Sequence, residues 1–203
     1  MAAQVRKGRR NAAVAVPVPA PPPPLPPAAG PDGAPAVAPV NIRPRYVGGM
    51  GEHVVMAELL GRGFNVSRAI VDEGIDVIAF KPTNPQKLFR LQVKSAFPGA
   101  GGGAATQKYT FTLSRAAYEN AAGQDYYLIL VMRDVKHETF VTFVIPKAIF
   151  DDYIDNQDVI DWNEEKKSWQ IAVHLHDDGK LTLKNAGGTE VTMQTKNRWN
   201  RVA

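Results

Sequence analysis

The chain of 203 residues contains no cysteine, and none of its apolar runs approaches the roughly 18 residues that a membrane-spanning helix needs. The first absence excludes disulfides, zinc sites built on thiolates and cysteine nucleophiles. The second leaves no transmembrane span. A basic cluster followed by residues 12–16 resembles a signal peptide, but prolines from Pro17 onward interrupt the apolar run too early. We therefore expect a cytoplasmic protein without a membrane partner.

Large apolar side chains are scarce in the first 46 residues. Twelve of the sixteen prolines lie before residue 46, and a proline run such as 21–24 prefers extended polyproline II. Such a segment can form neither a helix nor a paired strand. We predict a disordered, basic, proline- and alanine-rich arm at residues 1–46. It is either a linker or an arm that contacts DNA or a partner protein.

The net charge of +4 is concentrated in this arm. Residues 1–45 carry six basic side chains and one acid, which leaves the remainder of the chain near −1. The folded part is therefore not basic as a whole. If it binds nucleic acid, the arm or a local patch must supply the charge that neutralises phosphates.

Hydrophobic periodicity predicts an α/β core at 47–155 and a β-rich extension packed on it at 156–203. Helices are predicted at 51–60, 114–122 and 146–154, with Ser114 as a cap. Strands are predicted at 64–70, 75–80, 88–95, 109–113, 126–132, 139–145, 169–175 and 180–183. The prolines between the strands at 75–80 and 88–95 suit a hairpin, so these two strands should be neighbours.

Polar side chains interrupt these two strands. Asp76 stands where the first strand enters the core, and burying a carboxylate is costly unless a cation or several donors accompany it. Gln92 and Lys94 share one face of the second strand, because side chains two residues apart point the same way. If the strands pair, the three polar groups converge at one end of the hairpin.

Such a group suits the hydrolysis of a phosphodiester bond, for which a hard divalent ion held by oxygen ligands activates water and stabilises charge. Asp76 would be the main ligand of Mg²⁺ (or Mn²⁺). The side-chain oxygen of Gln92 and the backbone carbonyl of Val93 would be further ligands. Glu52, on the preceding helix, would reach the ion directly or through water. Lys94 would orient or activate the attacking water and stabilise the transition state.

The order and spacing of Glu52, the segment 74–77 and Gln92-Val93-Lys94 resemble the PD-(D/E)XK, restriction-endonuclease-like nucleases. The resemblance spans residues 48–150 and is closest to branches with glutamine before the lysine, among them Mrr-like restriction enzymes. The helix-borne glutamate resembles that of archaeal Holliday junction resolvases. In that superfamily the four corresponding positions form the active site, here Glu52, Asp76, Gln92 and Lys94. The resemblance implies a mixed β-sheet flanked by helices and Mg²⁺-dependent cleavage of DNA.

Two departures keep alternatives open. Gln92 is neutral, so the site has one negative ligand fewer than the usual acidic pair, and Ile75 replaces the usual proline. One alternative is a catalytically inactive module that binds nucleic acid or protein. Within the nuclease class, the alternatives are a Holliday junction resolvase and a homing endonuclease. A homodimer is expected by analogy, because cutting two strands with one site per chain is easiest with two chains.

Several other polar residues are interpreted from their positions. We expect the nucleic acid to be contacted by four residues near the tripeptide or the glycine-rich loop at 99–105: Arg68, Arg90, Ser95 and Lys108. His174 and His176 share a strand face that we interpret as solvated and not as a metal site. The three tryptophans at 162, 169 and 199 are expected to pack in the core or under a lid.

Overall fold

The computed structural model describes residues 43–70, 74–99, 105–120, 125–155, 159–193 and 199–202. Most of the predicted arm and residues 100–104 of the glycine-rich loop lie outside these ranges. The elements are α1 (Arg43–Gly61), β1 (Asn65–Arg68), β2 (Val77–Lys81), β3 (Asn84–Ala96), β4 (Thr106–Ser114), α2 (Arg115–Asn120), β5 (Tyr126–Asp134), β6 (Thr139–Pro146), α3 (Lys147–Asp155), β7 (Asp161–Asn163), β8 (Ser168–His176), β9 (Leu181–Lys184), β10 (Glu190–Met193) and the 3₁₀ helix η1 (Trp199–Val202).

The first sheet is mixed and has the strand order β1-β2-β3-β5-β6. Neighbouring strands are antiparallel except β3 and β5, which run parallel. A parallel pair needs a crossover connection, and here β4 and α2 lie between the two strands in sequence. The predicted α/β class, with a mixed sheet and flanking helices, is confirmed.

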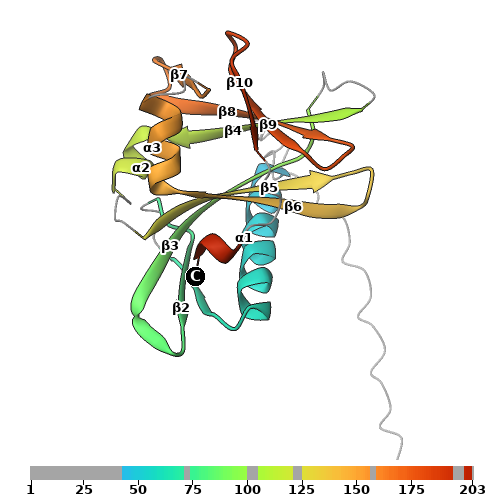
Figure 1. Cartoon of the computed structure of the whole chain (residues 1–203). Helices are drawn as coiled ribbons and strands as arrows, with labels where there is room; N and C mark the ends of the chain where they lie inside the picture. Colours follow the sequence, from blue (N-terminus) through green and yellow to red (C-terminus); the bar gives the residue numbers. More distant parts are fainter. Residues whose placement is uncertain are drawn as a thin grey trace, which may run out of the picture. The chain divides into compact units, whose positions relative to one another are not determined.

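The second sheet is antiparallel and has the order β10-β9-β8-β4, with β7 paired to β8. It joins β4 to strands of the C-terminal segment, since Tyr109 pairs with Val173 in register. Figure 1 shows the two sheets one above the other, with α2 and α3 at one end of the space between them. The predicted extension at 156–203 is therefore not a separate layer, because its strands share a sheet with β4 of the predicted core.

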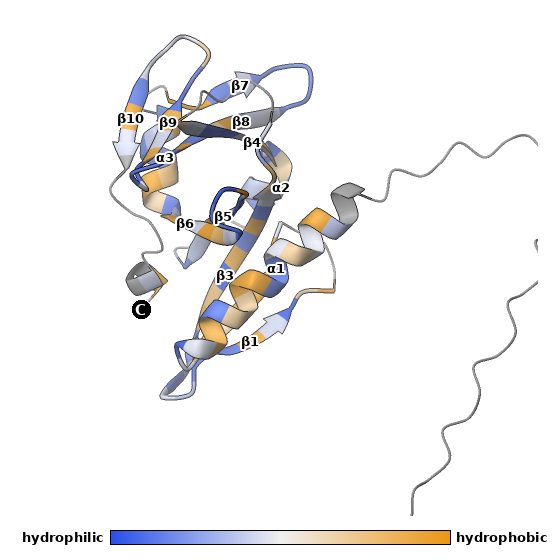
Figure 2. Ribbon diagram, turned by 90° about the vertical axis from the view of Figure 1, so that its right-hand side faces the viewer, coloured by the Kyte–Doolittle hydropathy of each residue, from blue (hydrophilic) through white to orange (hydrophobic). Residues whose placement is uncertain are grey.

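Alternation along β5 creates two cores. Leu128, Leu130 and Met132 face the second sheet, whereas Ile129 and Val131 face the other way, toward α1. All five are fully buried, and burial of each such side chain stabilises the fold by about 1.5–3 kcal/mol. Figure 2 shows α1 alongside β3, on the face of the first sheet that carries the second core.

Two boundaries differ from the sequence prediction. α1 begins at Arg43, eight residues before the predicted start at residue 51. β2 and β3 are separated only by Pro82 and Thr83, because β3 begins at Asn84. The outer part of β3 is exposed, so its residues show no hydrophobic alternation that could have predicted it.

The three tryptophans agree with the expected packing only in part. Trp169 and Trp199 are buried, and the indole N–H of Trp199 donates to Thr142 Oγ1 at 3.1 Å. Trp162 is 38% exposed, so the expectation of core packing is wrong for this ring.

In the part of the chain that the structure describes, no helix combines the length and apolar character needed to cross a membrane.

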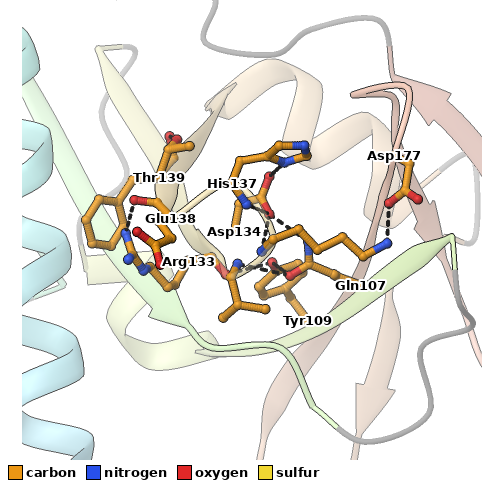
Figure 3. Close-up of polar contacts among 11 residues, drawn as sticks. Gln107, Tyr109, Arg133, Asp134, His137, Glu138, Thr139 and Asp177 are labelled. Atoms are coloured by element: carbon orange, nitrogen blue, oxygen red, sulfur yellow. Dashed lines mark hydrogen bonds and ion pairs between the residues drawn. The ribbon is translucent and has the colours of Figure 1, made fainter.

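A buried polar cluster fastens β4 to the turn between β5 and β6 (Figure 3). Gln107 donates from Nε2 to Asp134 Oδ1 at 2.8 Å, and His137 Nδ1 lies 2.7 Å from Asp134 Oδ2. The backbone N–H groups of Lys136 and His137 also donate to Oδ1. The hydroxyl of Tyr109 donates to the carbonyl of Arg133 at 2.8 Å. These contacts join the two sheets at one end.

The hydrogen bonds of this cluster determine the acidity of Asp134. Burial alone would raise the pKa of Asp134, but the hydrogen bonds from Gln107 and His137 outweigh burial and lower the pKa to about 2. The unfolded carboxyl has a pKa of 3.8. The ionised carboxylate therefore stabilises the fold at neutral pH by about 2 kcal/mol, and this stability is lost as the pH falls from about 4 through 2.

We therefore expect Asp134→Asn to lower the free energy of unfolding at pH 7 and to reduce its loss between about pH 4 and pH 2. Urea unfolding of both proteins across this pH range measures the effect. Asp177→Asn serves as the control, because the Asp177 side chain is half-exposed and pairs with Lys136 at the edge of the cluster. Equal pH dependence in wild type and Asp134→Asn would contradict the assigned role.

Candidate active site

Asp76 lies immediately before β2, where β3 continues beyond its partner. The backbone N–H of Asp76 donates to Leu91 O at 2.9 Å, which extends the pairing of β2 with β3 by one residue. The next donor of β3 on this side, the N–H of Val93, is taken by the carboxylate, with 2.6 Å to Asp76 Oδ2. Gln92 Nε2 donates to the same oxygen at 2.7 Å. The structure thus brings Asp76, Gln92 and Val93 together at the end of β2.

The amide of Gln92 is buried between the two sheets. Its side chain faces the second sheet, since Gln92 pairs in register with Leu128, and it is 1% exposed. Because Nε2 is directed at Asp76, the other end of the amide is an acceptor, and Gln92 Oε1 has no hydrogen-bond partner. The amide therefore presents an oxygen atom that no described group uses.

Glu52 reaches the same end of the sheet from α1. Its side chain is 14% exposed, and Oε2 lies 2.5 Å from Arg68 Nε in an ion pair. The angle of this contact does not meet that of a hydrogen bond. Arg68 ends β1 and pairs with Val77, the residue after Asp76. The N–H of Ala69 donates to the Asp76 carbonyl at 2.9 Å. The ion pair therefore holds Glu52 beside the strand end that carries Asp76.

The close approach of α1 to β3 depends on Gly51. A Cβ atom at this position would lie 2.2 Å from Ser95 Oγ and 2.7 Å from Ser95 Cβ. Real Cβ atoms do not approach other heavy atoms so closely, so glycine is required for this packing. Ser95 faces α1 together with Val93, and its hydroxyl is buried without a hydrogen-bond partner. Gly51 therefore sets the position of the neighbouring Glu52.

The predicted basic residues are distributed unevenly. Arg90 and Lys94 lie on the same face of β3 as Gln92, and Lys94 lies on the stretch beyond the end of β2. The side chain of Lys94 forms no hydrogen bond or ion pair with another of the described residues. Lys108 is not brought to this group, because it lies on the face of the second sheet that points away from the core, beside His174 and Lys184. Its predicted role in binding nucleic acid would need that outer face.

The two histidines of β8 lie on this outer face. Burial, followed by the charges of Lys108 and Lys184, lowers the pKa of His174 below its usual value. His176 Nε2 lies 2.9 Å from Thr182 Oγ1. Within the described ranges no three His, Cys, Asp or Glu side chains are grouped to hold a metal ion. A cation near Asp76 would therefore need amide or carbonyl oxygens in addition to the two carboxylates.

Tyr126 is a member of the group that the sequence did not indicate. It is the first residue of β5, pairs in register with Arg90 and is fully buried. Burial, followed by the negative charge of Asp76, raises the pKa of its hydroxyl well above the usual value. A tyrosine at the start of an apolar strand is typical of a core residue, so no local signal distinguished it. The signal is its hydroxyl, which is buried without a hydrogen-bond partner.

Unpaired polar atoms are concentrated around Asp76. Five buried side-chain oxygens of the described residues have no hydrogen-bond partner, and four belong to this group: Glu52 Oε2, Gln92 Oε1, Ser95 Oγ and Tyr126 OH. A buried polar group without any partner costs about 1–3 kcal/mol, and native proteins retain few of them. Glu52 Oε2 is compensated by its ion pair with Arg68. Gln92 and Tyr126 face the second sheet, whereas Ser95 faces α1. The carboxylate and amide oxygens suit a hard divalent cation, and the hydroxyls suit water or phosphate.

Comparison with known proteins gives limited information. No protein-family model matches the chain, and no curated protein is significantly similar to it. Among solved structures, similarity is found to I-Ssp6803I, a bacterial homing endonuclease, with 19% identity and a TM-score of 0.38 over 54% of this chain and 69% of that one. Similarity is also found to Archaeoglobus fulgidus Hjc, a Holliday junction resolvase from an archaeal hyperthermophile, with 17% identity and a TM-score of 0.37 over 61% and 82%. At these TM-scores neither similarity establishes a shared fold.

We expect Gly51→Ala to lower the free energy of unfolding by about 1–3 kcal/mol, because the added methyl group must push α1 away from Ser95. The control is Gly48→Ala in the same helix, where nothing lies within 4 Å of an added Cβ and alanine is favoured by up to about 1 kcal/mol. Urea unfolding measures both. Ser95→Gly should restore much of the stability of Gly51→Ala, and failure of this rescue would contradict the packing argument.

Proposed function

We propose that this protein is a metal-dependent endonuclease that hydrolyses phosphodiester bonds of DNA. The observation that supports this proposal is that four buried side-chain oxygens on α1, β3 and the first residue of β5 have no hydrogen-bond partner in the described part of the chain. Two of the four, on Glu52 and Gln92, stand together with Asp76 and Lys94 at the positions that resemble the PD-(D/E)XK active site. The proposal includes membership of that superfamily and cleavage in the presence of Mg²⁺ or Mn²⁺.

The residues that would hold the ion are Asp76, Gln92 through Oε1, and Glu52, with the Val93 carbonyl as a further ligand. The hydrogen bond from Gln92 Nε2 to Asp76 fixes the amide so that its oxygen remains an acceptor. When bound, a divalent cation supplies charge stabilisation at the phosphoryl oxygens and lowers the pKa of a water molecule. The ion pair with Arg68 keeps Glu52 at this end of the sheet before any cation arrives.

Lys94 would act on the phosphate and on the attacking water. It follows Gln92 by two residues on the same face of β3, so its ammonium group extends from the same side of the strand. The side chain of Lys94 has no hydrogen-bond or ion-pair partner among the described residues. Its three N–H donors can therefore bind a phosphoryl oxygen or orient water. It would thus stabilise the charge that develops as the phosphodiester bond breaks.

Positive charge for binding DNA would come from local residues. The folded part has a net charge near −1, so it cannot attract a polyanion as a whole. The side chain of Arg68 is 58% exposed beside Glu52, and Arg90 lies on the same face of β3 as Gln92 and Lys94. The outer-face Lys108 is a further contact that we propose, whereas the Ser95 hydroxyl is buried against α1 and is not available to DNA in this arrangement.

A second candidate function is a module that binds nucleic acid without cutting it. The observation that favours it is the small number of carboxylates: among the described residues this group holds two, Glu52 and Asp76, and Glu52 already lies 2.5 Å from Arg68. An arginine so close competes with a cation for the carboxylate. Cleavage and binding must therefore be measured separately, with Ca²⁺ supporting binding in place of Mg²⁺.

We expect purified protein to nick or linearise supercoiled plasmid in Mg²⁺ or Mn²⁺ and to be inactive in EDTA. Asp76→Asn and Lys94→Ala should each reduce the rate by at least about 100-fold, because each removes a group that acts on the reacting atoms. Asp178→Asn, at an exposed turn of the second sheet, is the matched control and should cut like wild type. Equal rates in all four proteins would exclude the enzyme. A four-way junction in the same assay distinguishes a resolvase.

We also expect Gln92→Glu to bind Mn²⁺ about 10-fold more tightly than wild type, because it restores a second charged ligand beside Asp76. Without metal the same variant should melt at a lower temperature, since two carboxylates then share a buried site and the Nε2–Asp76 hydrogen bond is lost. Gln170→Glu, on the outer face of β8, is the control for added charge. Calorimetric titration with Mn²⁺ measures the affinity, and unchanged affinity would argue against Gln92 as a ligand.

A further inference from the structure

Tyr126 is the member of the site group to which the proposed chemistry assigns no role. We infer that Tyr126 is a positioning residue: its hydroxyl donates a hydrogen bond toward the Asp76 carboxylate, directly or through one buried water, and so fixes that carboxylate for metal binding. Its importance for metal binding rests on the proposed function. The contact itself does not.

The position of the Tyr126 ring is fixed by its surroundings. The ring is fully buried and meets Tyr118 edge-to-face, with centroids 5.5 Å apart and an interplanar angle of 77°. Tyr118 in turn packs against Phe150 at 5.1 Å and Trp169 at 5.4 Å. The Tyr118 hydroxyl is engaged with Asp151 and so is directed to another partner. The Tyr126 hydroxyl therefore cannot reach solvent by rotation of the ring.

The face of the sheet directs this hydroxyl toward Asp76. Tyr126 pairs in register with Arg90, so its side chain emerges on the same face as Gln92, two residues farther along β3. The Asp76 carboxylate accepts the hydrogen bond from Gln92 on that face. The Tyr126 and Gln92 side chains thus project from diagonally neighbouring positions of one sheet face, and Gln92 contacts the Asp76 carboxylate on that face.

The protonation states favour donation from tyrosine to aspartate. A tyrosine hydroxyl is protonated at the pH of ordinary assays, so the Tyr126 hydroxyl is a hydrogen-bond donor there. A buried donor left unpaired beside a carboxylate is unfavourable, whereas a hydrogen bond to a charged acceptor is among the stronger ones. The acceptor that satisfies the Tyr126 hydroxyl is therefore Asp76.

The consequence of such a bond is orientation. Val93 and Gln92 donate to a single oxygen of Asp76, Oδ2. A donor from the side of β5 adds a constraint from a different strand, so the carboxylate plane is held by groups on both β3 and β5. Groups that hydrogen-bond to metal-binding carboxylates commonly change metal affinity by about 10–100-fold when they are removed.

The test is Tyr126→Phe, which removes only the hydroxyl, in wild type and in Asp76→Ala. If the hydroxyl donates to Asp76, Tyr126→Phe lowers the urea midpoint of the wild type by about 0.5 M and has no such effect in Asp76→Ala. Tyr127→Phe is the matched control, because Tyr127 is the next residue and faces the other core. If Asp76→Ala does not fold, the difference between Tyr126→Phe and Tyr127→Phe in wild type decides.

Metal binding supplies the second measurement. The dissociation constant for Mn²⁺ should rise about 10-fold in Tyr126→Phe and remain unchanged in Tyr127→Phe. An equal or higher urea midpoint in Tyr126→Phe overturns the inference, since removal of a merely unpaired hydroxyl stabilises a core. A lower midpoint with unchanged Mn²⁺ affinity overturns the positioning role. Failure of the wild type to bind Mn²⁺ overturns the proposed function, whereas the Tyr126–Asp76 contact is still decided by the urea midpoints.

Discussion

The hydrogen bond from the Val93 N–H to the Asp76 carboxylate is the interaction on which the site depends. β3 has thirteen residues and β2 only five, so β3 must continue past the start of its neighbour. A backbone donor left unpaired at such a point is costly, and the side chain of Asp76 replaces the missing strand. The same carboxylate then collects Gln92. The unpaired backbone of β3 thus places an acid beside the part of β3 that continues past the start of β2.

The alternation of β3 divides the site between two layers. Gln92 and Lys94 project toward the second sheet, whereas Val93 and Ser95 project toward α1. A shift of one residue in register would exchange these sets and place the amide under the helix. Packing on both faces opposes such a shift, because Leu91 and Val93 belong to a core of fourteen buried residues. The geometry of the polar group is therefore maintained by the apolar residues between its members.

Much of this arrangement follows from local patterns in the sequence. Asp76 and Gln92 were visible because each interrupts an apolar strand, and the pairing of those strands followed from the prolines between them. The cap of α2 was also visible, and the Ala117 N–H donates to Ser114 Oγ at 3.4 Å. The arm was predicted to end at residue 46, but its last four residues belong to α1. The need for glycine at position 51 of this helix is explained only by Ser95, a residue far along the chain.

Other features depend on tertiary contacts that no local pattern contains. β4 follows β3 in sequence but belongs to the second sheet, where it pairs with β8, about sixty residues later. Because of this pairing, Lys108 points away from Asp76. Tyr126 has the sequence context of an ordinary core residue, and only its neighbours across the sheet make its hydroxyl part of the site. Strand alternation predicts which residues share a face. It does not predict what that face meets.

The neutral side chain of Gln92 illustrates how folding and metal binding oppose each other at one position. An amide can donate to Asp76 and thereby satisfy the carboxylate when no cation is present, as the 2.7 Å hydrogen bond does. A glutamate there would add a ligand but would also place two negative charges in a buried site, which disfavours the metal-free fold. Asp76 is already required by the backbone of β3 and cannot be given up. For the proposed metal site, Gln92 is therefore the position at which metal affinity and the stability of the metal-free fold oppose each other, and Glu52 and the carbonyl of Val93 would supply the ligands that the amide does not.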